Sequence, residues 1–132
     1  MSLLLLDTTF MIDAERGVIE LGELIGDDDD VAIAAITVAE LSVGVHLASG
    51  HTRDRRQEFL SDVCDSIPIL DYDRSVAAEH ASLLTAVRES GHPRGAHDLI
   101  IAATARASKR TVVTADGSAF NDLPGVTVRG HR

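Results

Sequence analysis

Leu3-Leu4-Leu5-Leu6-Asp7-Thr8-Thr9 opens the chain with four consecutive apolar residues and ends them at a carboxylate. A short run that is apolar at every position, without alternation, is typical of a strand buried on both faces of a sheet. An acid directly after such a strand lies at the edge of the core, where a charged group loses hydration. The stretch therefore predicts a buried parallel strand with a carboxylate at its carboxyl end.

Apolar runs alternate with helical periods along the rest of the chain. Strands separated by helices predict an α/β fold, with a central, mostly parallel sheet flanked by helices on both faces. Pro68 cannot donate a ladder hydrogen bond, so its strand is expected at a sheet edge. We expect strands at residues 3–6, 31–36, 67–70, 111–114 and 126–128, and helices at 8–15, 17–25, 37–49, 52–65, 74–90 and 97–108.

Length and composition suit one globular domain. The chain has 132 residues, of which 45% are hydrophobic and only 3% aromatic, so the expected core is aliphatic. The single cysteine, Cys64, excludes an internal disulfide framework and fits a reducing compartment. The first apolar run is too short for a signal peptide or a membrane span, and we expect a cytoplasmic protein.

The net charge of -9 argues against a broad nucleic-acid-binding surface, because phosphate affinity comes mainly from Lys and Arg. All the basic residues except Lys109 are arginines, however, and arginine suits forked phosphate contacts. A bound divalent cation would also offset part of the negative charge locally. An acidic chain further favours a basic protein partner.

Four acidic residues stand where a folded domain usually places apolar side chains. Glu40 and Asp98 begin the apolar faces of two helices, whereas Asp7 and Asp116 follow apolar strands. In a parallel α/β sheet, helix amino ends lie beside strand carboxyl ends, so all four acids are expected at one edge, where such sheets bind ligands. Carboxylates gathered there repel one another, and a divalent metal is the usual compensation.

Each acid also has a structural interpretation when it is taken alone. Thr37-Val38-Ala39-Glu40 matches a capping box, and Asp7 can cap a helix that begins at Thr8. Asp98 suits a helix amino end through the macrodipole, and Asp116-Gly117 suits a turn. The four together favour a shared site, because each falls at the same edge.

Other chemistries have weaker support. The sequence has neither a glycine-rich phosphate loop nor an Asp-x-Asp pair after its first strand, and its histidines form no zinc-type cluster. His92 and His97 flank Pro93-Arg94-Gly95-Ala96, where a role near a substrate stays open. The run Asp27-Asp28-Asp29-Asp30 is interpreted as a solvated loop.

This pattern resembles PIN-domain ribonucleases, specifically the VapC toxins of bacterial toxin–antitoxin pairs. The resemblance runs from end to end and implies a single PIN domain over residues 1–132, with a three-layer PIN-like fold. It rests on four segments: Leu6-Asp7-Thr8, Thr37-Val38-Ala39-Glu40-Leu41, His97-Asp98-Leu99-Ile100-Ile101-Ala102-Ala103 and Val113-Thr114-Ala115-Asp116.

The resemblance implies an Mg²⁺-dependent endoribonuclease, with Mn²⁺ as the alternative ion, that hydrolyses RNA phosphodiester bonds and inhibits translation and growth. Its direct metal ligands would be Asp7 and Asp98. The full set of implied site residues comprises four catalytic, metal-binding acids and two supporting threonines: Asp7, Glu40, Asp98, Asp116, Thr8 and Thr114. Arg94, just ahead of Asp98, is the residue that we expect to contact phosphate.

The family would add a homodimer and a cognate VapB-type antitoxin that covers the site. Because aromatic residues are few, we expect a structured RNA to be recognised through its shape and backbone. The alternative is a non-catalytic PIN-like module that binds protein. Intact acids at all four positions favour the nuclease, since a binding module need not keep them.

Overall fold

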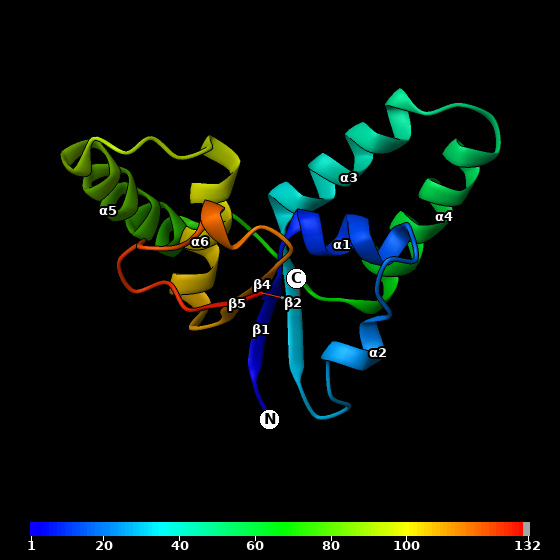
Figure 1. Cartoon of the computed structure of the whole chain (residues 1–132), viewed down its shortest axis with the longest axis horizontal. Coiled ribbons are helices and arrows are strands. Elements are labelled where there is room, and N and C mark those ends of the chain that lie inside the picture. Colours follow the sequence, from blue (N-terminus) through cyan, green and yellow to red (C-terminus); the bar gives the residue numbers. More distant parts are fainter. Residues whose placement is uncertain (131–132) are drawn as a thin grey trace.

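The structure, a computed structural model, describes residues 1–130 and has a five-stranded parallel sheet at its centre in the order β3-β2-β1-β4-β5 (Figure 1). The strands are β1 (Leu3–Leu6), β2 (Asp30–Ala34), β3 (Ile69–Leu70), β4 (Thr111–Thr114) and β5 (Val128–Gly130). The helices are α1 (Thr8–Glu15), α2 (Leu21–Leu24), α3 (Ala35–Leu47), α4 (Gly50–Ser66), α5 (Arg74–Ser90) and α6 (Ala96–Ser108), with a short 3₁₀ helix η1 (Gly117–Ala119).

The leucine run forms the middle strand, β1. It pairs in parallel with β2, where Leu4 lies opposite Val31, and with β4, where Leu5 lies opposite Val112. Leu4 and Leu5 have no exposed surface. A strand with two neighbouring strands and two covered faces excludes polar side chains, which explains a run without alternation.

Two apolar cores, one on each face of the sheet, make this a three-layer fold. On one face Leu5 packs with Leu83 of α5 and Ile101 of α6. On the other face Leu6 packs with Phe10 of α1. Helices α5 and α6 accordingly lie on one side of the sheet and α1 on the other, while α3 and α4 extend outward as a hairpin (Figure 1). The predicted fold class is confirmed.

Arg110 ties the amino edge of the sheet together. Its guanidinium donates to the carbonyl oxygens of Leu4 and Asp30 at 3.2 and 2.8 Å, and it pairs with the Asp30 carboxylate at 2.8 Å. Only 13% of the Arg110 side chain is exposed, so these bonds replace water. The guanidinium of Arg110, the residue that precedes β4, therefore joins the starts of β1 and β2.

The predicted boundary between the second strand and the next helix is wrong. The apolar run at 31–36 leaves the sheet after Ala34, and α3 begins at Ala35 instead of residue 37. An apolar run without alternation suits a buried strand and a buried helix equally, so the sequence did not fix the point of change. The predicted edge position of the strand near Pro68 is confirmed, because β3 pairs only with β2.

Two further segments are shorter or shifted relative to prediction. Within 17–25 only Leu21–Leu24 is helical, because the chain first turns at Gly17, whose φ is 74°. The last strand begins at Val128 instead of residue 126, since the chain still turns at Gly125, whose φ is 71°, and the Val126 N–H donates to the Leu123 carbonyl oxygen. No helix within residues 1–130 is long and apolar enough to cross a membrane.

Candidate active site

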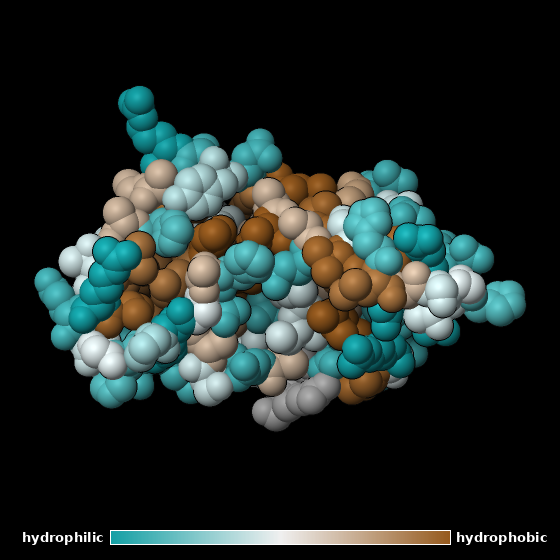
Figure 2. Space-filling model, turned by 90° about the horizontal axis from the view of Figure 1, so that it is seen from above, coloured by the Kyte–Doolittle hydropathy of each residue, from teal (hydrophilic) through white to brown (hydrophobic). Residues whose placement is uncertain are grey.

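The predicted site lies at the carboxyl edge of the sheet. In Figure 1, β1 runs from the amino terminus toward α1, so the view from above in Figure 2 looks onto this edge. Hydrophilic side chains lie near the centre of that face, with hydrophobic side chains on either side (Figure 2). β1 and β4 end at this edge, and α3 and α6 carry the remaining two acids near their amino ends.

Asp7 is buried, with 2% of its surface exposed, and each of its carboxylate oxygens accepts hydrogen bonds. The Thr9 hydroxyl and the Phe10 N–H donate to Oδ1 at 2.7 and 3.0 Å, and the Thr114 hydroxyl donates to Oδ2 at 2.7 Å. Asp7 thus caps α1, as one interpretation predicted, and it also faces the site. Burial raises the pKa of Asp7, and the three donors oppose that rise.

Threonines link Asp7 to the end of β4. The hydroxyls of Thr9 and Thr114 lie 3.2 Å apart, and Thr9 accepts a bond from the Ala115 N–H at 3.0 Å. Thr114 in turn accepts from the Asp116 N–H at 2.9 Å. Thr114 was predicted to support the acids, and the structure gives Thr9 an equal part.

Glu40 lies in α3 and is not a helix cap. The helix begins at Ala35, so the predicted capping box from Thr37 to Glu40 is wrong. One Glu40 oxygen accepts a hydrogen bond from the Thr8 hydroxyl at 2.7 Å, and the other lies 3.4 Å from His97 Nδ1. Thr37 is fully buried, and its hydroxyl lies 3.1 Å from the Thr8 hydroxyl, which it helps to hold. The sequence pattern assigned Thr37 a capping role, whereas the structure places it in the site.

Asp98 is the least compensated of the four acids. It lies in the first turn of α6 and is half-buried, and no side-chain or backbone hydrogen bond reaches its carboxylate within residues 1–130. Burial raises the pKa of Asp98 most, the charges of Asp7, Glu40 and Asp116 raise it further, and His97 lowers it. Three acids therefore act on Asp98 electrostatically, as the sequence predicted.

Gly95 makes room for this carboxylate. It precedes α6, and a Cβ atom built on Gly95 would lie 2.9 Å from Asp98 Oδ2. That separation is too short for a non-bonded carbon, so any larger residue at position 95 has to displace the Asp98 side chain. The absence of a side chain at Gly95 therefore allows the Asp98 carboxylate to take its observed position.

Asp116 completes the set at the end of β4. It is exposed, precedes η1 and accepts a hydrogen bond from the Ser118 hydroxyl. Among the described residues, no three His, Cys, Asp or Glu side chains close on a common point at metal-ligand distance. Asp7 and Glu40 are turned toward threonine hydroxyls instead.

A sequence model of the PIN domain matches residues 4–126. The chain belongs to the PIN domain family. Ribonuclease VapC2 of Rickettsia felis is 28% identical over 79% of this chain and 76% of its own length. Toxin FitB of Neisseria gonorrhoeae is 35% identical over 89% of this chain and 91% of its own length.

Solved structures share the fold of this PIN domain. VapBC2 of Rickettsia felis, bound to a promoter DNA fragment, matches with a TM-score of 0.88 over 98% of this chain and 99% of the matched chain, at 24% identity. VapBC-5 of Mycobacterium tuberculosis matches with a TM-score of 0.80 over 97% and 98%, at 31% identity. FitAcB of Neisseria gonorrhoeae matches with a TM-score of 0.73 over 95% of each chain, at 34% identity.

Arg94, the expected phosphate contact of this PIN domain, holds a loop. Its guanidinium donates to the carbonyl oxygens of Ser118 and Ala119, both at 3.2 Å, and to that of Asn121 at 2.6 Å. These bonds support the η1 turn that follows Asp116. Phosphate contact by Arg94 stays a prediction, while its part in supporting the loop was not indicated by the sequence.

Replacing Asp98 by Asn is expected to raise the melting temperature at neutral pH in metal-free buffer. The raised pKa means that the folded protein holds this proton more tightly than the unfolded chain, so ionisation costs stability as the pH rises above the ordinary value of 3.8. A neutral amide avoids that cost. The gain should therefore be full at neutral pH and should vanish as the pH falls below 3.8.

Thermal denaturation across this pH range checks the prediction. Asp62→Asn, which neutralises an exposed acid in α4, is the matched control and should change little. A lower melting temperature for Asp98→Asn at neutral pH would contradict the inferred repulsion.

Proposed function

We propose that this PIN domain is a VapC-type toxin, a divalent-metal-dependent endoribonuclease that hydrolyses RNA phosphodiester bonds and so inhibits translation and growth. The observation that carries the proposal is the Asp98 carboxylate, which is half-buried under the charge of three other acids without a hydrogen-bond donor in residues 1–130. An acid with only a structural role would leave that repulsion uncompensated. The relatives named Ribonuclease VapC2 and Toxin FitB support the same function.

The donor chemistry of the site fits Mg²⁺, with Mn²⁺ as the alternative. All four side chains offer oxygen, which these hard cations prefer, and no Arg or Lys side chain pairs with any of them in the described part of the chain. In this proposal Asp7 and Asp98 hold the cation directly, and Glu40 and Asp116 complete the site. When bound, such a cation lowers the pKa of a water molecule and balances charge that develops at the phosphate.

The supporting side chains position the acids before any ligand arrives. Thr9, Thr114 and the Phe10 N–H restrain the two oxygens of Asp7, and Thr8 restrains Glu40. Asp98 is the acid left free to turn toward a ligand, while Arg94 supports the loop beyond Asp116 and is retained as a proposed phosphate contact.

Asp98→Asn is expected to lower RNA cleavage by a factor on the order of 10² or more, while the fold is kept and the metal-free protein melts no lower than the wild type. Removing the least compensated carboxylate should remove a metal ligand without breaking a hydrogen bond. Cleavage of a labelled RNA in Mg²⁺ or Mn²⁺ measures the effect, with Asp62→Asn as the active control. Full activity of Asp98→Asn would exclude its assigned role, and an inactive wild type would favour the non-catalytic PIN-like module.

Gly95→Ala tests the placement of the same carboxylate rather than its charge. The added Cβ should displace Asp98 and lower cleavage by about 10- to 100-fold, since small misplacements in a catalytic site have effects of that order. The backbone of Gly95 has a φ of -60°, which alanine adopts without strain, so stability should be kept. Wild-type cleavage rates in this variant would show that the position of Asp98 is not critical.

Mg²⁺ or Mn²⁺ is expected to stabilise the wild type. A cation at about 100 times its dissociation constant adds roughly 2.7 kcal/mol if it binds only the folded state. Asp98→Asn should lose most of that gain. Calorimetry with and without the cation, at matched ionic strength, makes the comparison, and an equal gain in both proteins would place the cation elsewhere.

We further propose a VapB-type antitoxin as the protein partner and a cytoplasmic location for the pair. Solved neighbours are described as VapBC from Salmonella typhimurium bound to DNA and FitAB bound to a DNA fragment. Four carboxylates at one edge of the sheet attract an Arg or Lys side chain, and the charge of -9 favours a basic segment. If a basic side chain of the antitoxin tail enters the acidic site, the tail should compete with Mn²⁺ for binding. An antitoxin that blocks the site from a distance would not compete with Mn²⁺.

The same proposal includes a homodimer joined through the outer face of α3. Helix α3 packs against α4, yet its Val43 and Leu47 are 53% and 83% exposed, and Ala39 extends this apolar stripe by one turn. Apolar side chains aligned on an exposed helix face are typical of a protein interface. These apolar side chains can be buried only against a second protein surface.

Leu47→Glu is therefore expected to convert the dimer to a monomer, because the interface would have to bury a charge. Sedimentation velocity measures the mass in solution. Val18→Glu, which makes the same change at an exposed apolar residue after α1, is the control and should leave the dimer intact. A dimer that persists in Leu47→Glu would exclude this face.

A further inference from the structure

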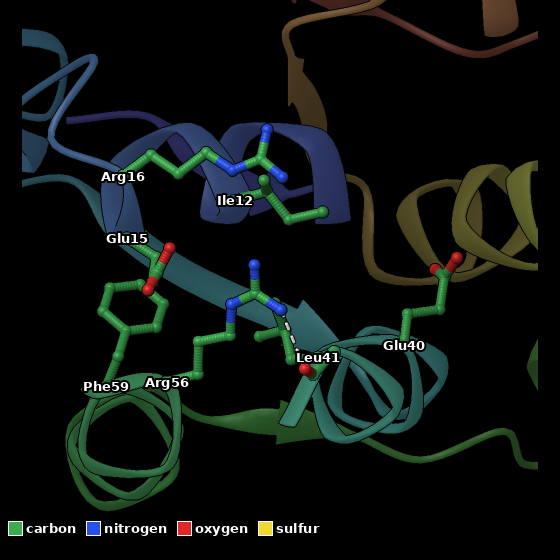
Figure 3. Close-up of a pocket in the computed structure, with 8 residues that line it drawn as sticks. Ile12, Glu15, Arg16, Glu40, Leu41, Arg56 and Phe59 are labelled. Carbon is green, nitrogen blue, oxygen red and sulfur yellow. Dashed lines mark hydrogen bonds between the residues drawn. The ribbon is translucent and has the colours of Figure 1, made fainter. Parts of the chain in front are cut away.

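A pocket of about 110 Å³ lies beside the acidic edge, between α1, α3 and α4 (Figure 3). Its charged and aromatic walls are Glu15 and Arg16 from the end of α1, and Arg56 and Phe59 from α4. Glu40 borders the pocket as well as the acidic site. None of the four wall residues has a part in the proposed hydrolysis, so the pocket has no role yet.

The wall carries both a buried acid and guanidinium groups. Only 8% of the Glu15 side chain is exposed, and its ion pair is a 3.5 Å contact with Arg55, which is itself 64% exposed. Arg56 donates one hydrogen bond to the Gly44 carbonyl oxygen at 2.9 Å. Its other N–H groups donate to no acceptor within residues 1–130, so they are available to a ligand. In Figure 3 the Arg56 guanidinium extends into the space between the helices, while Glu15 and Arg16 line the pocket from the end of α1.

This mixture of groups restricts the occupant. A cationic side chain would pair with Glu15 but meet two arginines, and an anionic one would meet Glu15. An apolar side chain would leave the Glu15 carboxylate with only its 3.5 Å contact to Arg55 and would leave the free N–H groups of Arg56 without an acceptor. A neutral planar group matches every wall of the pocket. Its donor edge suits the Glu15 carboxylate, its acceptor edge suits the arginine N–H groups, and its apolar face suits Phe59.

The volume selects a single such group. Pockets for drug-sized ligands measure roughly 300–1,000 Å³, well above the space here. One base fits that limit better than a whole nucleotide or a peptide segment. Arg53 and Arg55 lie close to Arg56 in α4, with Asp54 between them, and add positive charge on this side of the pocket.

We propose that the pocket binds an unpaired guanine base of the RNA substrate, next to the phosphate that is cleaved. Guanine N1–H and N2–H₂ would donate to the Glu15 carboxylate, and its O6 and N7 would accept from Arg16 or Arg56. Phe59 offers the apolar surface for the base face. The inference rests on the proposed ribonuclease function and adds a base preference to it.

Equilibrium binding of short uridine-rich RNAs tests the pocket apart from catalysis. Each RNA carries one guanosine, inosine or adenosine, and fluorescence anisotropy is measured in EDTA. The wild type should bind the guanosine RNA about tenfold more tightly than the adenosine RNA, with inosine between them because it lacks the N2 amino group. Glu15→Gln should reduce the preference for guanosine to within about twofold.

Two further variants keep the result interpretable. Glu58→Gln makes the same change at an exposed acid that lies beside Phe59 in the sequence but does not line the pocket, and it should behave as the wild type. Phe59→Leu keeps apolar packing and should weaken all three RNAs by a similar factor. Thermal denaturation checks that each variant is folded.

The outcomes separate this inference from the proposed function. A wild type that cleaves these RNAs in Mn²⁺ without preferring guanosine overturns the guanine pocket and leaves the ribonuclease intact. A guanosine preference that survives Glu15→Gln also overturns it, as does an RNA affinity that both pocket variants leave unchanged. A wild type that neither binds nor cleaves RNA overturns both proposals.

Discussion

The carboxyl edge of the sheet depends on how one buried carboxylate is satisfied. Asp7 follows the central strand directly, so it cannot leave the core without moving β1. Its oxygens accept from Thr9 and Phe10 in α1 and from Thr114 at the end of β4. A single acid thus fixes the angle at which α1 leaves the sheet and the height at which β4 ends, and the neighbouring acids are placed relative to that frame.

The sequence predicted the fold well because its main determinants are local. Four leucines without alternation require two covered faces, and the helical periods between apolar runs require crossover helices. The edge at which the acids meet also follows from the parallel topology, since Asp7 and Asp116 come after strands while Glu40 and Asp98 lie early in helices. The charges of Asp7, Glu40 and Asp116 raise the pKa of Asp98, as expected for acids at one edge of the sheet.

What the sequence missed are contacts between distant residues. Thr9 and Thr114 are 105 positions apart, so their shared hold on Asp7 leaves no local signal. Arg94 finds its carbonyl partners 24 to 27 positions ahead, beyond the reach of motif spacing. The error at Glu40 has another cause: a capping box and a site acid share the same local pattern, and only the start of α3 at Ala35 distinguishes them.

Arg110 gives the opposite edge of the sheet a different character. There a cation meets two carbonyl oxygens and a carboxylate, and the strands begin with their charges paired. At the other edge the Asp98 carboxylate has no ion pair within residues 1–130, and burial and the neighbouring acids raise its pKa. The two ends of the strands therefore differ in charge. A molecule attached to a surface by the loop ahead of β2 presents its acidic edge to solution, whereas one attached by the η1 loop covers that edge.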